Sequence, residues 1–406
     1  MEEVIALVLA AGKGTRMKSK LPKVLHKAGG VPMVGQVLRA VKDAGTKREI
    51  VVVGFGAEAV TAYVGETAET VVQKEQLGTG HAVLQAESLL QGEKGILLVT
   101  CGDTPLVRTE TFRALLDCHK KTQASATVLT ACMPDPTGYG RVIRSADGKV
   151  SKIVEQKDGT SQELAVNEVN AGIYCFELPE LWELLHRIGN NNAQGEYYLT
   201  DIIGMLVADG KTVSAVAAED YRETLGVNSR LQLAQAEKIL RERKLEELMT
   251  EGVTVQDPSN TYVETTVTVG RDTVLYAGTV LEGRTVIGEN CEIGPFVRLT
   301  NVVMGDGNSL QYTYAHDCTI ENNLTAGPFV HFRPKTHIED HVKVGNFMEV
   351  KNSHIGEGTK LPHLSYIGDS DVGAGVNIGC GTITCNYDGK KKYKTIIGKN
   401  VFIGSD

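Results

Sequence analysis

The 406-residue sequence contains no apolar stretch long enough to cross a membrane, and its N-terminus leads straight into a strand pattern instead of a signal peptide. These absences predict a cytoplasmic protein without membrane insertion. The sequence also lacks an excess of positive charge, since its formal net charge at pH 7 is −8. Because a nucleic-acid backbone binds to a basic surface, this balance argues against a nucleic-acid partner.

Disulfide and metal-binding patterns are also absent. The eight cysteines are scattered without a C-x-x-C pair and without a cluster of Cys and His at ligand spacing. We therefore expect free and mostly buried thiols at Cys101, Cys118, Cys132, Cys175, Cys291, Cys318, Cys380 and Cys385.

The chain is too long for a single hydrophobic core, so two domains are expected. Its first 227 residues alternate short apolar runs with amphipathic segments. This alternation predicts an α/β domain with a largely parallel sheet, which binds ligands at the carboxyl ends of its strands. The expected strands are 50–53, 96–99, 126–129 and 172–176, and the expected helices include 110–121 and 179–188.

A glycine-rich, cationic loop follows the first apolar run, residues 4–8. Gly12 and Gly14 allow backbone N–H groups to approach an anion, so the loop predicts phosphate binding. It lacks the third glycine of the dinucleotide fingerprint and the Lys-Ser/Thr pair of a Walker A loop. A purely structural turn is the alternative, but three nearby cations favour phosphate: Lys13, Arg16 and Lys23.

The second half of the chain has a different period. Residues 228–251 predict a long helix and a plausible domain linker. Beyond it, aliphatic residues recur every six positions, which predicts a parallel β-helix whose coils each contain three short strands. The expected inward positions are Val263, Val269, Leu275, Leu281, Ile287, Ile293, Leu299, Ile320, Ala326, Phe332, Ile338, Val344, Val350, Ile355, Leu361, Ile367, Val372, Ile378, Thr384, Ile397 and Ile403.

Residues 385–396 break this repeat and predict a loop extruded from the coils. The loop contains a run of lysines, which is usually a solvated surface. A functional role for it is the alternative.

The whole chain resembles the family of bifunctional N-acetylglucosamine-1-phosphate uridyltransferase/glucosamine-1-phosphate acetyltransferase (GlmU) enzymes. The resemblance rests on the Leu-Ala-Ala-Gly loop at 9–12 and on the segments 76–82, 102–103, 138–141, 191–198, 363–366 and 381–389. It implies a Rossmann-like α/β nucleotidyltransferase domain at 1–227, a linker helix at 228–251 and a left-handed parallel β-helix of hexapeptide repeats at 252–406. The implied activity is acetyl transfer to glucosamine-1-phosphate, followed by uridylyl transfer from UTP with release of pyrophosphate.

In the first domain, the resemblance implies that Arg16 and Lys23 face the phosphates and that Asp103 and Asn228 bind Mg²⁺. The chemistry agrees, because attack of a sugar phosphate on UTP joins two anions that need screening cations. A simple turn aspartate is the alternative for Asp103. The implied nucleotide and sugar contacts are Leu9, Ala10, Ala11, Gly12, Arg16, Lys23, Gln73, Gly78, Thr79, Cys101, Gly102, Asp103, Gly140, Glu155, Asn170 and Asn228.

In the β-helix, acetyl transfer requires a base, because the accepting amine is an ammonium at neutral pH. His363 stands in a Pro-His-Leu-Ser-Tyr context that matches the base of the family. The resemblance also implies a homotrimer in which neighbouring subunits share the acetyl site. Its implied sugar-phosphate contacts are Arg333, Lys351, Tyr366 and Asn377, and its acetyl-CoA contacts are Cys380, Asn386, Tyr387 and Ser405.

Three departures from the family pattern matter. Ala171 and Cys380 are mild replacements, whereas the sequence ends at Asp406 within a coil that relatives continue. Because the further coils complete the acetyl-CoA pocket in relatives, we expect weaker acetyl-CoA binding here. The alternative function is a single-activity sugar-1-phosphate nucleotidyltransferase whose β-helix is only an assembly scaffold.

Overall fold

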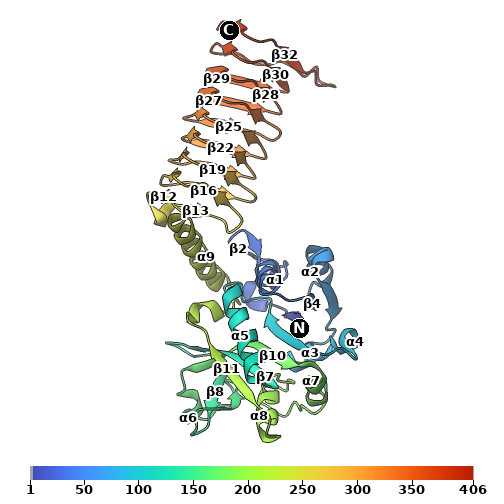
Figure 1. Cartoon of the computed structure of the whole chain (residues 1–406). Coiled ribbons are helices and arrows are strands. Elements are labelled where there is room, and N and C mark those ends of the chain that lie inside the picture. The colour runs from blue at the N-terminus through green and yellow to red at the C-terminus, as the bar shows by residue number, and fades with distance from the viewer. Residues whose placement is uncertain (1–2, 406) are drawn as a thin grey trace. The chain divides into compact units, whose positions relative to one another are not determined.

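The computed structural model describes residues 3–405 and contains two compact units. One unit ends at Glu237 and the other begins at Lys238, so the division falls inside helix α9 (Arg230–Thr250). The predicted boundaries at 227 and 251 enclose this helix. Figure 1 shows the first unit as a sheet flanked by helices and the second as a stack of coils.

The first unit is built on a sheet that has nine strands within the described residues. Neighbours on its main path are parallel, except that β10 runs antiparallel to both β6 and β7. The prediction of a mostly parallel sheet is therefore confirmed. The path is β11 (Val213–Ala217), β7 (Ala126–Cys132), β10 (Glu168–Glu177), β6 (Ile96–Cys101), β1 (Val4–Ala10), β4 (Arg48–Val53) and β5 (Glu69–Val72), with β8 (Arg141–Arg144) and β9 (Val150–Val154) beside it.

Helices cover both faces of this sheet. Along β1, Ile5 and Leu7 pack into one hydrophobic cluster, whereas Val4, Ala6 and Val8 pack into another on the opposite face. Burial on both faces explains why the parallel strands are continuous apolar runs. The helices are α1 (Met33–Asp43), α2 (Ala57–Val64), α3 (Thr79–Leu84), α4 (Glu87–Leu90), α5 (Thr109–Thr122), α6 (Ser161–Leu164), α7 (Leu178–Leu185) and α8 (Asp201–Ala208), and β2 (Lys27–Ala28) pairs with β3 (Val31–Pro32).

The four predicted strands and both predicted helices are present in this unit. The helix predicted at 179–188 ends earlier, at Leu185. The chain turns there because the N–H of Arg187 bonds to the Leu184 carbonyl, three residues back instead of four.

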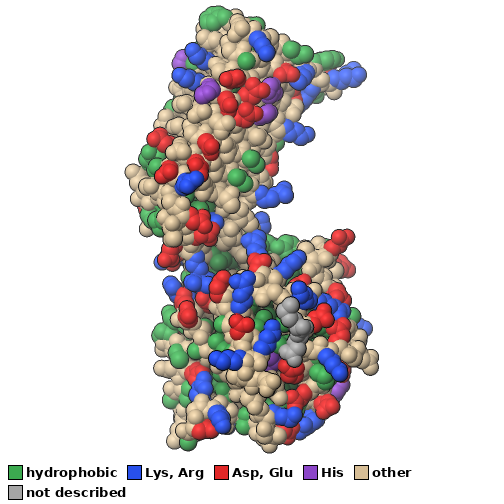
Figure 2. Space-filling model, in the orientation of Figure 1, with side chains coloured by type: hydrophobic (Ala, Val, Ile, Leu, Met, Phe, Trp, Pro, Cys, Tyr) green, Lys and Arg blue, Asp and Glu red, His purple; other side chains and the backbone are tan. Residues whose placement is uncertain are grey.

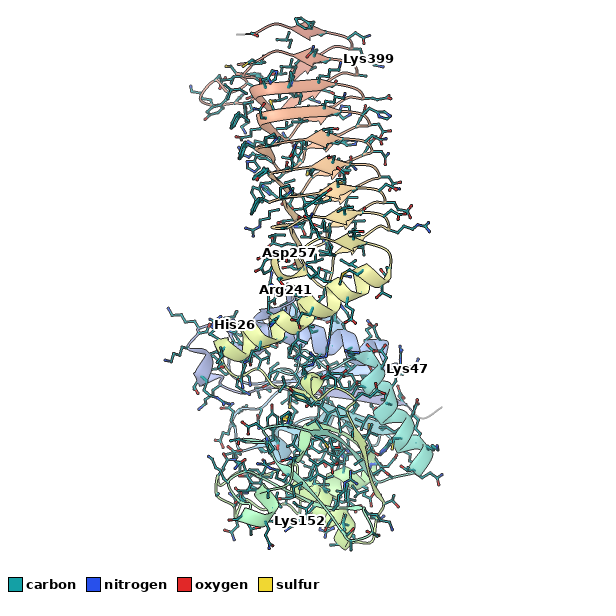
Figure 3. All side chains as sticks on the ribbon, turned by 90° about the vertical axis from the view of Figure 1, so that its left-hand side faces the viewer. His26, Lys47, Lys152, Arg241, Asp257 and Lys399 are labelled. Atoms are coloured by element: carbon teal, nitrogen blue, oxygen red, sulfur yellow. The ribbon has the colours of Figure 1, made fainter. Side chains whose placement is uncertain are left out.

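The second unit contains the end of α9 and a left-handed parallel β-helix with three faces. Figure 3 shows the stacked coils, with Arg241 of α9 near the first of them, and the Arg241 guanidinium lies 4.4 Å from the centre of the Tyr262 ring. β27 and β29 bend around one corner, so that they belong to face 1 and then to face 2.

Face 1 contains β12 (Thr254–Val255), β15 (Val274–Leu275), β18 (Glu292–Ile293), β21 (Ser309–Leu310), β24 (Thr325–Ala326), the first parts of β27 (Lys343–Lys351) and β29 (Lys360–Gly368), β31 (Asn377–Ile378) and β33 (Phe402–Ile403). Face 2 contains β13 (Tyr262–Val263), β16 (Val280–Glu282), β19 (Arg298–Thr300), β22 (Thr313–His316), β25 (Val330–Phe332) and the second parts of β27 and β29. Face 3 contains β14 (Thr268–Val269), β17 (Val286–Ile287), β20 (Val303–Met304), β23 (Thr319–Ile320), β26 (His337–Ile338), β28 (His354–Ile355), β30 (Ser370–Val372) and β32 (Thr395–Ile397).

The six-residue repeat placed the core of the β-helix correctly. Nineteen of its inward positions, from Val263 to Thr384, are buried, and the last two, Ile397 and Ile403, pack partly buried against the same cluster. Each coil alone could not bury its aliphatic side chains, so the stacking of coils provides the continuous core.

The predicted loop at 385–396 is present, but it ends at Lys394. Thr395 and Ile396 belong to β32, because they pair with Ser370 and Asp371 on face 3. Figure 2 shows lysine side chains at the tip of this loop, where it projects from the coils.

All eight cysteines are free, as predicted. The expectation that most are buried is wrong: Cys132 and Cys385 are exposed, and only Cys175, Cys291 and Cys318 are fully buried. Cys132 is the last residue of β7, and Cys385 lies in the extruded loop. Within the described residues, no helix has the length and apolar character needed to cross a membrane.

Candidate active sites

A cavity of about 240 Å³ opens at the carboxyl ends of β1 and β6 in the first unit. This is where the sheet was expected to bind its ligand. Ten of the predicted nucleotide-site residues line the cavity: Leu9, Ala10, Ala11, Gly12, Lys23, Gln73, Gly78, Thr79, Cys101 and Asp103. Val24, Gln76, Ala82 and Glu196 also line it, and the sequence had assigned them no role.

The loop after β1 needs glycine at position 14. Gly14 has a φ of 58°, and a Cβ on it would lie 2.7 Å from the Cβ of Lys23. Only glycine combines this left-handed backbone with so close an approach. The fold of the loop therefore fixes Lys23 at the edge of the cavity.

Gly78 fixes the opposite wall of the cavity. It has a φ of 116°, and a Cβ there would lie 2.6 Å from the Tyr197 carbonyl oxygen. The N–H of Tyr197 donates to the Leu77 carbonyl at 2.8 Å, which holds Glu196 beside the cavity. The buried Gln73 side chain donates to the Gly78 carbonyl at 3.2 Å.

Lys23, Asp103 and Asn228 form one polar cluster. The Lys23 ammonium contacts the Asp103 carboxylate and donates to Asn228 Oδ1 at 2.9 Å. The N–H of Val227 donates to the Asp103 carbonyl at 2.9 Å, which brings the 227–228 segment to the end of β6. The structure therefore joins two residues that lie far apart in the sequence and that the resemblance had paired.

Gly140, Glu155 and Asn170 form a second group. The N–H of Asn170 donates to the Gly140 carbonyl at 2.9 Å, and a Cβ on Gly140 would lie 3.5 Å from both Glu155 carboxylate oxygens. Burial raises the pKa of Glu155, and the nearby carboxylates of Asp201 and Asp158 add to the effect. A hydrogen bond from Thr200, at 3.1 Å, favours the charged form and opposes this rise.

Six of the sixteen predicted residues do not line the cavity. Four of them, Gly140, Glu155, Asn170 and Asn228, belong to the two groups described above, and the other two are Arg16 and Gly102. Arg16 is exposed on the short 3₁₀ helix Thr15–Met17. Gly102 lies behind the cavity, where its N–H donates to the Leu9 carbonyl at 2.9 Å. Burial raises the pKa of the Cys101 thiol to about 12, so Cys101 is a neutral wall residue and not a nucleophile.

In the second unit, His363 lies on the bend of β29 between faces 1 and 2. It pairs with Asn346 on β27, its side chain is exposed, and the next residue, Leu364, has a φ of 31°. The buried Ser365 hydroxyl donates to the His363 carbonyl at 2.8 Å and fixes this bend. The imidazole is thus presented on a protruding corner.

Arg333, Lys351 and Tyr366 point outward from neighbouring strands of face 2, since the residue next to each is buried in the core. Arg333 donates to the Glu349 carboxylate at 2.7 Å. Asn377 lies on face 1, across the His363 corner from these three residues.

The predicted acetyl-CoA residues divide into two groups. Cys380 and Ser405 follow the ends of face 1 strands in successive coils, where a Cβ on Gly379 would lie 2.8 Å from the Ser405 nitrogen. Asn386 and Tyr387 belong to the extruded loop, and Asn386 Nδ2 donates to the Gly368 carbonyl at 3.0 Å.

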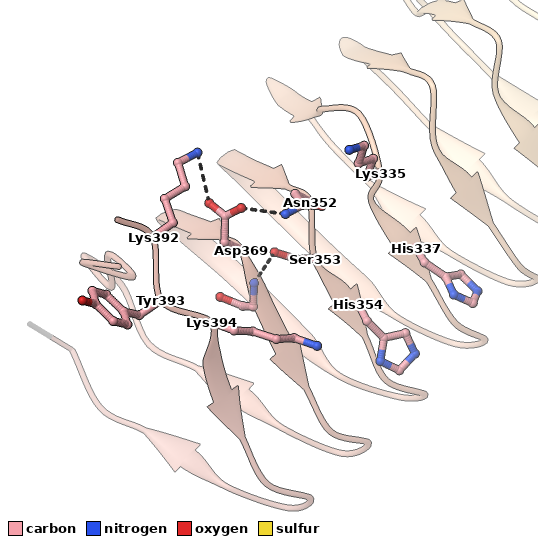
Figure 4. Close-up of a pocket in the computed structure, with 10 residues that line it drawn as sticks. Lys335, His337, Asn352, Ser353, His354, Asp369, Lys392, Tyr393 and Lys394 are labelled. Atoms are coloured by element: carbon pink, nitrogen blue, oxygen red, sulfur yellow. Dashed lines mark hydrogen bonds and ion pairs between the residues drawn. The ribbon is translucent and has the colours of Figure 1, made fainter. Parts of the chain in front are cut away.

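The same loop covers a polar pocket of about 410 Å³ that the sequence had not indicated (Figure 4). Lys392 forms an ion pair with Asp369 at 3.6 Å, and Asp369 accepts from Asn352 Nδ2 at 2.6 Å. The nearby Lys392 ammonium lowers the pKa of Lys351. The sequence had two interpretations of the lysine run, a solvated surface or a functional loop. One of its lysines, Lys392, lies beside Lys351, a predicted sugar-phosphate contact.

Comparison with known proteins identifies the family. A nucleotidyl transferase family model matches residues 5–238, and a bacterial transferase hexapeptide model with six repeats matches residues 266–301. The bifunctional protein GlmU of Geobacillus sp. (strain WCH70) is 54% identical over 98% of this chain and 87% of its own length. The chain belongs to the GlmU family. GlmU of Pelotomaculum thermopropionicum is 54% identical over 100% of this chain and 88% of its own length.

GlmU of Exiguobacterium sp. (strain ATCC BAA-1283 / AT1b) is 50% identical over 99% of the chain and 89% of its own length. A solved UDP-glucose pyrophosphorylase in complex with UDP-glucose matches 60% of this chain and 100% of its own chain, with a TM-score of 0.48 and 17% sequence identity. Membership of the GlmU family confirms the resemblance, the two-part fold and the bifunctional activity. The chain is an enzyme with uridylyltransferase and acetyltransferase activities that together make UDP-N-acetylglucosamine.

Proposed function

We propose that the cavity of the first unit binds UTP and N-acetylglucosamine-1-phosphate and that the β-helix corner at His363 binds glucosamine-1-phosphate and acetyl-CoA. The observation that carries this assignment is the cluster of Lys23, Asp103 and Asn228 at the end of β6, beside a glycine loop that lines the cavity. This cluster would supply one cation and two oxygen ligands to the phosphates of the substrates. The residues Leu9 to Gly12, Gln73, Gly78 and Thr79 would hold the uracil and ribose.

Asp103 and Asn228 fit a Mg²⁺ ion. Their side-chain oxygens both reach the single Lys23 ammonium, so they are close enough together to share one small cation. Within the described residues no group of three or more His, Cys, Asp or Glu could hold a metal. Mg²⁺ does not need one, because it keeps several waters and is typically held by one or two protein oxygens and by substrate phosphates.

When bound, Mg²⁺ would neutralise charge on the triphosphate. Lys23 would share that role from the glycine loop, and Arg16 would reach the phosphates from solvent. Gly140, Glu155 and Asn170 would contact the acetylated sugar, with Cys101 and Gly102 shaping the wall behind it. These groups orient the attacking phosphate oxygen and screen its repulsion from the α-phosphate, which is most of what this reaction needs.

In acetyl transfer, His363 would accept the proton that the ammonium of glucosamine-1-phosphate must lose. Its exposure leaves the imidazole free to meet the amine. Arg333, Lys351, Tyr366 and Asn377 would hold the sugar phosphate, and Cys380, Asn386, Tyr387 and Ser405 would contact acetyl-CoA. A positioned base of this kind contributes about 10²–10⁴ in rate.

We place this enzyme in the cytoplasm, where UTP and acetyl-CoA are available, and infer that it forms a homotrimer. The test is a pair of assays on one preparation. Pyrophosphate should be released from UTP and N-acetylglucosamine-1-phosphate only with a divalent cation, and CoA should be released from acetyl-CoA and glucosamine-1-phosphate. Pyrophosphate release without any binding of acetyl-CoA in calorimetry would instead support the scaffold alternative.

A further inference from the structure

One side chain of the nucleotide cavity, Gln73, is held by a residue that lies behind the cavity wall. Gln73 directly follows β5 and is buried, with 3% of its surface exposed. Its Nε2 atom donates to the Gly78 carbonyl at 3.2 Å and lies 3.0 Å from Nδ1 of His81. His81 belongs to α3 and lines a neighbouring, mostly apolar pocket of about 260 Å³. His81 therefore reaches the nucleotide cavity through the Gln73 side chain.

These two contacts fix the orientation of the Gln73 amide. The amide nitrogen has two hydrogens, and the Gly78 carbonyl and the His81 ring take one each. A carbonyl oxygen can only accept, so Gln73 must present its nitrogen to Gly78 and not its oxygen. The Nδ1 atom of His81 must then accept as well, which requires a neutral imidazole with its proton on Nε2. The Oε1 atom of Gln73, on the other side of the amide carbon, faces away from both partners.

The other ring nitrogen of His81 does not reverse this assignment. Gln85 Nε2 donates to the His81 carbonyl at 2.9 Å and lies 3.2 Å from Nε2 of the ring. Gln85 is half-buried, so its amide can turn and present oxygen to the ring, or exchange this contact for water. The buried Gln73 has no such exchange, and a donor facing another donor there would leave a hydrogen bond unmade. The buried contact therefore decides the tautomer of His81.

A fixed carbonyl oxygen in the cavity distinguishes the two pyrimidine bases. The N3 atom of uracil carries a hydrogen and donates to such an oxygen, whereas N3 of cytosine is an acceptor and would be repelled. We propose that His81 is a positioning residue that holds the Gln73 amide with Oε1 toward the base, so that the cavity prefers uracil nucleotides to cytosine nucleotides. The inference rests on the proposed binding of UTP in this cavity.

The test compares His81→Asn with His81→Gln in the full chain. The Asn oxygen takes the place of Nδ1, two bonds from Cβ, and can accept from Gln73, whereas the Gln amide extends toward the place of Nε2. Pyrophosphate release with Mg²⁺ and N-acetylglucosamine-1-phosphate gives kcat/KM for UTP and for CTP. Because one hydrogen bond is at stake, we expect the UTP-to-CTP ratio of kcat/KM to fall about five- to tenfold in His81→Gln, through a higher KM for UTP at unchanged kcat. In His81→Asn the ratio should match the wild type.

Three controls separate this role from a structural one. Gln favours helices more than Asn does, so a general loss of stability in α3 would harm His81→Asn more and reverse the expected order. In a Gln73→Ala background, His81→Gln should not change the ratio further, because its partner is gone. His186→Leu removes the other histidine of the apolar pocket, whose ring lies 3.1 Å from the Glu87 carboxylate, and should leave the ratio unchanged.

Several results would overturn the role of His81. These are equal ratios in His81→Asn and His81→Gln, a loss in kcat instead of a rise in KM, an effect of His81→Gln that persists with Gln73→Ala, or an equal fall in His186→Leu. A wild type that releases pyrophosphate from neither UTP nor CTP would refute the proposed nucleotide site itself. A wild type that uses UTP, with His81→Gln showing the same ratio, would refute only the role of His81.

Discussion

Replacing Asp103 with asparagine removes one negative charge from the nucleotide cavity and preserves the shape of the side chain. The Asp103 and Lys23 side chains are largely buried, with 18% and 12% of their surfaces exposed. In the variant the Lys23 ammonium would face two amide oxygens, one of them Asn228 Oδ1. Because the cation keeps polar partners, we expect the free energy of unfolding to fall by only about 1–3 kcal/mol.

The effect on uridylyl transfer should be larger. Loss of one preorganised charge-stabilising group lowers kcat about 10²–10³-fold, and the Mg²⁺ concentration for half-maximal rate should rise. Pyrophosphate release measured against Mg²⁺ concentration checks both, with Asp117→Asn on the exposed side of α5 as the matched control. Full pyrophosphate release by Asp103→Asn, or by the wild type in EDTA, would refute the role of Asp103.

Three further predictions concern other parts of the molecule. Gly78→Ala should lower the free energy of unfolding by about 1–3 kcal/mol through backbone strain and the clash with Tyr197. In the control Gly12→Ala, the new Cβ meets nothing within 4 Å, so thermal unfolding should be unchanged and only the KM for UTP should rise. Equal melting temperatures for the two variants would contradict this account. Both ring nitrogens of His354 face carboxylates, Asp371 at 3.1 Å and Glu339 at 2.8 Å, so this geometry requires the imidazolium. Burial lowers the pKa of His354, but the hydrogen bonds to Asp371 and Glu339 outweigh burial and raise the pKa overall. The imidazolium therefore stabilises the folded protein fully below about pH 6.5, and this stabilisation is lost as the pH rises through the folded-state pKa of His354. Thermal unfolding of His354→Gln should therefore differ from the wild type most at low pH, and a difference independent of pH would count against the imidazolium. In a chain extended to the length of its relatives, His363→Ala should lower the rate of CoA release about 10²–10⁴-fold while pyrophosphate release persists. If His331→Ala lowers CoA release and His363→Ala does not, the base is misassigned.

Regular patterns in the sequence predicted the fold well, because each reported one physical requirement. The six-residue repeat from Val263 onward follows from a core that must be continuous through stacked coils. The apolar runs of the first unit follow from burial on both faces of a sheet. The extruded loop was placed from the break in the repeat, although the return of Thr395 to face 3 depends on pairing with Ser370, which no local signal shows.

The sites were harder to predict because they join distant segments. Nothing in the spacing of residues brings Glu196 to the cavity, since its position depends on hydrogen bonds between Tyr197 and the 77–80 turn. The meeting of Lys23 with Asn228 likewise depends on the bond from Val227 to Asp103.

The most direct test of the bifunctional assignment is the identity of the nucleotide sugar that the protein makes. The protein is incubated with UTP, Mg²⁺ and either N-acetylglucosamine-1-phosphate or glucosamine-1-phosphate, and the products are identified by mass spectrometry. We predict UDP-N-acetylglucosamine from the acetylated sugar directly and from glucosamine-1-phosphate only when acetyl-CoA is added. Equal formation of a UDP-sugar from unacetylated glucosamine-1-phosphate without acetyl-CoA, or no UDP-N-acetylglucosamine from either sugar, would contradict the account.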